Sequence, residues 1–216
     1  MGALDRPVTL KRLSVFPLAG AVLFPGMQLP LHIFEPRYRA MVSAALAGDR
    51  LIGMIQPRVL GGPDTSATPA LFDMGCMGRI TDVEALDDGR YNMLLEGVAR
   101  LRVVRELEVA TPFRQIEAEV EAAAADDYLA SAERAALEQE ARRFAERQGY
   151  MVDWTAVGQL DDTAFVNGVA QVAPFDAAAK QAMLEANGIS ARAELIMQLL
   201  QFFGRRDSDD DRVTLQ

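Results

Sequence analysis

The chain has 216 residues, of which 50% are apolar and 25% are charged, and its formal net charge is −9. This composition is ordinary for a globular protein and excludes a fibrous or wholly disordered chain, while the length allows one or two domains. The acidic excess lies in the second half, since residues 1–120 hold 13 basic and 14 acidic residues and residues 121–216 hold 9 and 17. Because no basic cluster is available to neutralise phosphates, we expect no nucleic-acid partner.

Apolar residues alternate with other residues over Leu29–Ile33, which is the period of a strand with one buried face. The Pro25–Gly26 pair just before it is typical of a turn, and Pro36 suits the first turn of a helix that ends before Gly48. Strand-like segments follow at residues 51–55, 78–86, 91–95, 98–109 and 113–121, with a hairpin turn at 87–90 and a long loop over 56–75. Several short strands with one early helix indicate a closed or nearly closed barrel.

The hydrophobic period becomes helical after a change of composition at residues 122–127, which we interpret as a domain boundary. We expect a helix from a cap at Asp126 or Asp127 through Arg147, and a shorter helix that follows Asp161 and Asp162 and stops before Pro174. Two more are expected over residues 175–186 and over residues 191–203, the latter with a cap at Ser190. The sequence thus predicts an α+β protein. Its parts are a β-barrel domain over 1–121, an α-helical domain over 122–204 and a disordered acidic tail over 205–216.

The uncharged stretch from Ser14 to Phe34 and the single cysteine bear on where the protein resides. Three prolines within the 21 uncharged residues would each break a helix that spans a membrane, so we expect no membrane partner. Cys76 has no second cysteine with which to form an internal disulfide. Both observations favour a cytoplasmic protein.

No group of residues has the spacing of a catalytic or metal site. His32 could act as a base or a metal ligand, but no His or Cys cluster supplies further ligands, so a structural hydrogen bond is favoured. Cys76 lies among Met and Gly residues, without the electropositive neighbours of a reactive thiol, and is expected to pack. The GxxxxGK[ST] phosphate loop is absent from the sequence, and turn preference explains Asp87 and Asp88. We therefore expect no catalytic residue, no metal and no cofactor.

The run FPLAGAVLFPGMQLPLHIFEPRYRAMV, from Phe16 to Val42, carries a resemblance to a known family. It closely resembles the opening of the amino-terminal, substrate-binding domain of Lon proteases, which is also found in cereblon-like proteins. The resemblance continues through Gly78–Ile80, Asp88–Val103 and Lys180–Leu200, and it covers residues 9–203. It implies a PUA-like, six-stranded β-barrel followed by an α-helical bundle.

The same resemblance implies binding without chemistry. Lon proteases continue into an ATPase module and a serine–lysine peptidase, for which 216 residues leave no room. We therefore expect a stand-alone domain of the kind that bacteria encode as a separate small protein. The implied partners are proteins or unfolded peptide segments, and a homo-oligomer stays open. Two alternatives also stay open: a small-molecule or RNA binder, as PUA-like barrels are in other families, and a hydrolase with a reactive group near His32 or Cys76.

A candidate surface for partner binding surrounds the Pro25–Gly26 turn and the start of the helix that follows. Apolar side chains that can repack would suit varied partners. The alternative is that these apolar residues fill the core, which we favour for the methionines, while Glu35 complements a helix dipole and the arginines brace the barrel. The candidate residues are Phe24, Pro25, Met27, Phe34, Glu35 and Arg37.

Overall fold

The computed structural model describes residues 8–58, 69–122 and 128–213, and the chain divides into two compact units. Unit 1 comprises Met1–Ala124 and Phe175–Leu184, and unit 2 comprises Ala125–Pro174 and Glu185–Gln216. The segment 175–184, which we expected in the helical domain, therefore groups with the β-rich part of the chain. The predicted domain boundaries at residues 121 and 204 stay predictions.

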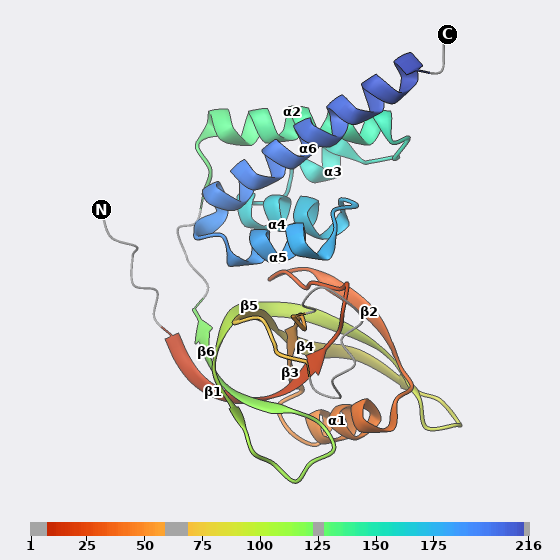
Figure 1. Ribbon diagram of the computed structural model, residues 1–216, viewed down its shortest axis with the longest axis vertical. Coiled ribbons are helices and arrows are strands. Elements are labelled where there is room, and N and C mark those ends of the chain that lie inside the picture. Colours follow the sequence, from red (N-terminus) through yellow and green to blue (C-terminus); the bar gives the residue numbers. More distant parts are fainter. Residues whose placement is uncertain (1–7, 59–68, 123–127, 214–216) are drawn as a thin grey trace. The chain divides into compact units, whose positions relative to one another are not determined.

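Six strands form one mixed sheet in unit 1 (Figure 1), with the order β2-β5-β4-β3-β1-β6. The pairs are antiparallel except for β1 with β3, which is parallel. The long strand β5 also pairs with β6, so the sheet curls back on itself. The strands are β1 (Val8–Pro17), β2 (Gln28–Ile33), β3 (Leu51–Ile55), β4 (Met74–Ala85), β5 (Tyr91–Leu107) and β6 (Gln115–Glu121). The predicted α+β class with six strands is confirmed.

The limits of three strands differ from those predicted. Strand β1 was missed, because its buried residues Leu13, Val15 and Phe16 do not keep a simple alternation. Strand β4 begins at Met74, within the predicted loop 56–75, of which residues 59–68 lie outside the described residues. The two strands predicted over 91–109 form the single strand β5, in which register shifts opposite β4 and β6 add the twist that a curled sheet needs.

Helix α1 (Pro36–Leu46) lies against one end of the curled sheet (Figure 1) and begins at the predicted proline. It buries Tyr38, Met41, Val42 and Ala45, which pack with residues of the strands in one apolar cluster. Core packing, which the sequence favoured for the methionines, is confirmed for Met41, Met54, Met74, Met77, Met93 and Met183.

Helix α5 (Ala177–Glu185) is tied to the sheet by side chains distant in sequence. Gln181 Nε2 donates to the Met74 carbonyl at 3.1 Å, and Arg100 Nη1 donates to the Leu184 carbonyl at 2.9 Å. Arg100 also forms a bidentate ion pair with Glu121, at 2.8 and 2.9 Å, and the two side chains are only 8% and 16% exposed. These bonds explain why segment 175–184 belongs with unit 1.

Unit 2 consists of α2 (Ser131–Arg147), α3 (Trp154–Val157), α4 (Asp162–Val172) and α6 (Gly188–Val213), with α2 and α4 packed against α6. The predicted caps Asp126 and Asp127 lie outside the described residues, and Glu133 accepts a hydrogen bond from the Ala130 N–H at the start of α2. The helix predicted after Asp161 and Asp162 is α4, and Asp161 is its N-cap. The prediction of Ser190 as a cap is wrong, because Gly188 turns the chain with a φ of 87° and α6 starts there.

Helix α6 reaches into the predicted disordered tail over residues 205–216, and that tail stays a prediction. The helix continues to Val213, and residues 214–216 lie outside the described residues. Extending a formed helix adds one backbone hydrogen bond for each residue that is fixed, so a helix can run on into polar sequence. Within the described ranges, no helix has the length and hydrophobicity to cross a membrane.

Candidate functional site

The predicted turn before β2 is present, and its backbone is hydrogen-bonded to strand β5. Met27 N–H donates to the Phe24 carbonyl at 3.1 Å, while Gly26 N–H donates to the Gly97 carbonyl and Gly97 N–H to the Met27 carbonyl, both at 2.8 Å. A Cβ on Gly97 would lie 2.1 Å from the Phe24 oxygen, so only glycine permits this approach. The Phe24 side chain is fully buried, so the prediction that Phe24 belongs to a binding surface is wrong. A Pro-Gly pattern predicts a turn but does not predict which side chain beside the turn points inward.

A buried glutamine holds the loop that leads to this turn. The Gln56 side chain donates from Nε2 to the carbonyls of Leu18, at 2.8 Å, and Ala21, and its Oε1 accepts from Gly20 N–H at 3.2 Å. A single side chain thus satisfies three backbone groups of one loop. Sequence reasoning missed Gln56, because it assigned this residue to the start of a long loop.

Phe34, Glu35 and Arg37 lie together at the junction of β2 and α1, and we call them the Phe34 surface. The Phe34 side chain is 61% exposed. Arg37 pairs with Glu35 at 2.9 Å, and its guanidinium lies 4.5 Å from the centre of the Tyr38 ring. The surface therefore offers an exposed aromatic ring beside one carboxylate and one guanidinium. Pro25 and Met27 are half-buried, and Met27 packs against the core.

A groove of about 430 Å³ runs beside Arg37 and is closed on its other side by the β5–β6 connection. Arg114 forms a bidentate ion pair with Glu106 there, at 2.6 and 2.7 Å, and donates to the Pro69 carbonyl at 2.8 Å. The side-chain hydrogen bond from Arg114 lowers the pKa of Glu106, and burial raises the pKa of Tyr38. The groove combines aromatic and charged side chains, which sequence reasoning did not bring together.

His32 forms a side-chain hydrogen bond of the kind that the sequence favoured, and it also lines a groove of about 470 Å³, so its structural role stays a prediction. Its Nδ1 lies 2.7 Å from Asn92 Oδ1, and Asn92 Nδ2 donates to Glu84 at 2.9 Å, so the three side chains form a ladder across β2, β5 and β4. Cys76 is fully buried, in agreement with the packing interpretation. In the part of the chain that the structure describes, no group of three or more His, Cys, Asp or Glu residues could hold a metal ion.

Unit 2 contains a second candidate, an apolar pocket of about 250 Å³ that we call the helical pocket. It is lined by aliphatic and aromatic side chains and one glycine, from α2, α3, α4, α6 and the segments between them. Its principal residues are Phe144, Tyr150, Trp154, Phe165, Val172 and Leu200. The sequence analysis did not predict this pocket, because α3 is too short to show a helical period. The residue that could have pointed to the pocket is Trp154, the one tryptophan of the chain.

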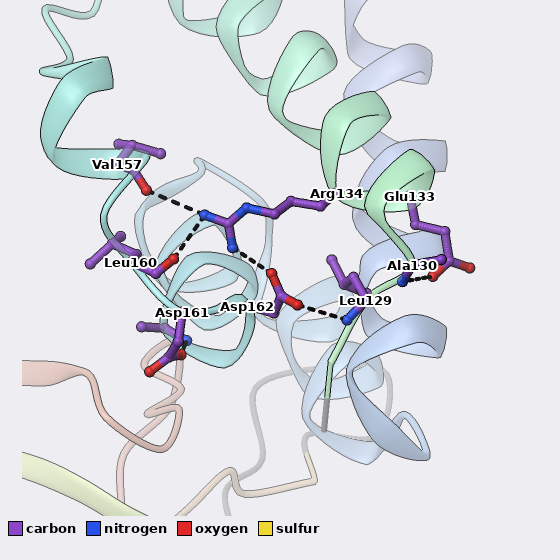
Figure 2. A network of polar contacts seen from close by, with 9 residues as sticks. Leu129, Ala130, Glu133, Arg134, Val157, Leu160, Asp161 and Asp162 are labelled. Carbon is purple, nitrogen blue, oxygen red and sulfur yellow. Dashed lines mark hydrogen bonds and ion pairs between the residues drawn. The ribbon is translucent and has the colours of Figure 1, made fainter. Parts of the chain in front are cut away.

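Two arginines of α2 hold the wall of the helical pocket. Figure 2 shows Arg134 donating to the carbonyls of Val157, at 3.5 Å, and Leu160, at 2.8 Å, and to the carboxylate of Asp162. The guanidinium of Arg142 lies 4.6 Å from the centre of the Trp154 ring. Polar contacts therefore fix a short helix that buries none of its own residues.

Asp162 completes this network. Its second carboxylate oxygen accepts the Leu129 N–H at 2.8 Å, so one carboxylate joins the start of α4 to the segment before α2 (Figure 2). The hydrogen bond from Arg134, followed by that from Leu129, lowers the pKa of Asp162. The Arg134 guanidinium also lies 5.1 Å from the centre of the Phe165 ring, which lines the pocket.

Solved structures of Lon amino-terminal domains share this fold. The Lon N-terminal domain protein from Xanthomonas campestris aligns with a TM-score of 0.63 at 22% identity, covering 88% of this chain and 98% of that one. The N-terminal domain of the Mycobacterium avium complex Lon protease aligns with a TM-score of 0.65 at 17% identity and the same coverage. The fold is therefore that of Lon amino-terminal domains.

The family model described as the ATP-dependent protease La (LON) substrate-binding domain matches residues 12–201, and the chain belongs to this family. Lon protease 2 of Myxococcus xanthus is 28% identical over 198 residues, which are 87% of this chain and 23% of that protein. Lon protease of Escherichia coli K12 is 24% identical over 201 residues, which are 88% and 24%. The chain thus spans about a quarter of these relatives, and the matches lie in the substrate-binding domain rather than in the protease or ATPase domains.

Proposed function

We propose that this protein is a non-catalytic module that binds proteins or unfolded peptide segments. The observation that supports this most is the match of residues 12–201 to a family of substrate-binding domains. The matched region excludes the ATPase and peptidase parts of Lon proteases, so the proposed activity is recognition alone. An exposed aromatic ring on unit 1 and an apolar pocket in unit 2 are suited to polypeptides that expose apolar side chains.

We propose the Phe34 surface as one contact site for such a polypeptide. Phe34 supplies a large apolar side chain that is 61% exposed, and Glu35 and Arg37 supply an acceptor and a donor beside it. Aromatic and arginine side chains contribute disproportionately to binding energy in protein interfaces. Pro25 and Met27 precede β2 whereas Phe34 follows it, so these two candidates lie at the other end of that strand and are not part of the Phe34 surface.

The test is the affinity for β-casein, an unfolded polypeptide, measured by fluorescence anisotropy with the intact protein. Replacing Phe34 by Ser removes the aromatic anchor, and burial of such a side chain contributes about 1.5–3 kcal/mol, or about tenfold or more in affinity. Val104→Ser is the matched control, because Val104 is also an exposed apolar residue of unit 1. We expect weaker binding by Phe34→Ser and unchanged binding by Val104→Ser. Equal affinity of both variants would exclude the Phe34 surface, and no binding by the wild type would exclude the function.

A further inference from the structure

The helical pocket gathers exposed apolar side chains at one place in unit 2. Tyr150, Val152, Leu160 and Val172 all line it, and each is exposed although apolar, Val172 by 77%. Single exposed apolar residues are common, but several that line one pocket mark a binding site.

The wall of the pocket is formed in advance of binding. Arg134 donates to the Leu160 carbonyl at 2.8 Å, and Asp153 caps α3 by accepting the N–H groups of Thr155 and Ala156 at 3.0 and 3.1 Å. A wall that is already ordered loses little conformational freedom when a ligand enters. The pocket is therefore suited to bind without rearrangement.

The size and lining of the pocket restrict its occupant. A volume of about 250 Å³ lies below the range of about 300–1,000 Å³ that is usual for sites of drug-sized ligands. Its lining has no convergent polar side chains of the kind that orient a free small molecule. The occupant that fits is one large apolar side chain, whose polar backbone stays outside in water.

Charges beside the pocket restrict the neighbours of that side chain. Asp153 and Asp161 are exposed and are next in sequence to the lining residues Trp154 and Leu160. No ion pair joins either carboxylate to a basic side chain among the described residues, whereas Arg142 pairs with Glu138 at 2.9 Å. Both carboxylates accept backbone N–H groups as helix caps but have no cationic partner, so their negative charge favours a segment with basic residues.

We propose that the helical pocket takes one large apolar side chain of a polypeptide segment, with Lys or Arg on either side of that residue. This inference rests on the proposed function and names the class of segment recognised. The two carboxylates attract the basic residues, while the pocket buries the apolar one.

Trp154 makes the test direct, because it is the one tryptophan of the chain and lines the pocket. The probe is a short capped peptide with one Phe between two pairs of Lys, titrated while Trp154 emission is recorded. Two matched peptides replace the Phe by Ser, or the four Lys by Glu. We expect a saturable change with the first peptide and at least about tenfold weaker binding of the other two, since the loss of 1.4 kcal/mol corresponds to tenfold.

Two variants locate the site. Val172→Lys places a charge at the exposed mouth of the pocket, and Met151→Lys places the same charge at a fully exposed residue that does not line it. We expect at least tenfold weaker peptide binding by Val172→Lys and a change of less than about threefold by Met151→Lys. Equal effects of the two variants, or equal affinity for the Ser peptide, would overturn the inference.

The proposed function fails separately from this inference. If the wild type binds β-casein but the Phe peptide leaves Trp154 emission unchanged, the pocket is not the subsite and polypeptide binding stands. If the wild type binds neither, the proposed function fails as well.

Discussion

Replacing Arg134 by Met should destabilise unit 2 strongly, because one guanidinium joins three parts of it. The Arg134 side chain is 22% exposed and that of Asp162 is 18% exposed, so water can compensate only in part for the lost bonds. The hydrogen bonds from Arg134 to Asp162 and to the Leu160 carbonyl are short, whereas the contact with the Val157 carbonyl, at 3.5 Å, is too long to contribute to stability. Breaking a buried pair costs about 3–5 kcal/mol, and the partial exposure reduces our expectation to about 3 kcal/mol.

The assay is urea denaturation followed by Trp154 fluorescence, which reports on unit 2 alone because this tryptophan lies there. Arg143→Met on the same helix is the control. Arg143 is well exposed and makes a single contact of 3.5 Å with Glu140, so its loss should change the free energy of unfolding by less than about 0.5 kcal/mol. If Arg134→Met lost less than about 1 kcal/mol, or no more than Arg143→Met, the network would not hold the pocket wall as we argue.

Three further predictions concern the sheet, helix α5 and acid. Gly97→Ala should destabilise unit 1 by about 3 kcal/mol in urea denaturation followed by circular dichroism, because its Cβ would overlap the Phe24 carbonyl, whereas Gly158→Ala should be neutral. Arg100→Met should speed amide hydrogen exchange in residues 177–184 while leaving unit 2 unchanged; unaltered exchange would contradict the anchoring role. The pKa of Asp162 in the folded state lies below its ordinary value of 3.8, so its ionised carboxylate stabilises unit 2 above that value, and the stabilisation is lost as the pH falls through the folded-state pKa. Asp162→Asn should therefore lose less unfolding free energy than the wild type between about pH 5 and pH 2, and parallel losses would refute this.

Local patterns in the sequence predict the elements that depend on local chemistry. Pro36 starts α1, Asp161 caps α4, and Gly89 turns the β4–β5 hairpin with a φ of 78°. Each of these residues acts within its own turn or first helical turn, so a short window of sequence contains the cause. The resemblance to Lon amino-terminal domains supplied the order of the two parts of the chain.

Features that depend on distant side chains could not be predicted in this way. Helix α5 groups with unit 1 because Arg100 reaches the Leu184 carbonyl, and these residues are 84 positions apart. The Phe24 backbone lies against β5 because Gly97, 73 positions away, has no side chain to block it. The helical pocket depends on hydrogen bonds from Arg134 to Leu160 and Asp162, which are 26 and 28 positions away. A pattern of apolar residues carries no information about such pairings.

The central claim is that this protein binds polypeptides through their exposed apolar side chains. The most direct test is to compare, by calorimetric titration of the intact protein, one polypeptide in its native disulfide-bonded form and in its reduced, alkylated and unfolded form. The account predicts saturable binding of the unfolded form and at least about tenfold weaker binding of the native form, because folding buries most of the apolar side chains that would be recognised. Equal binding of the two forms, or binding of neither, would contradict it.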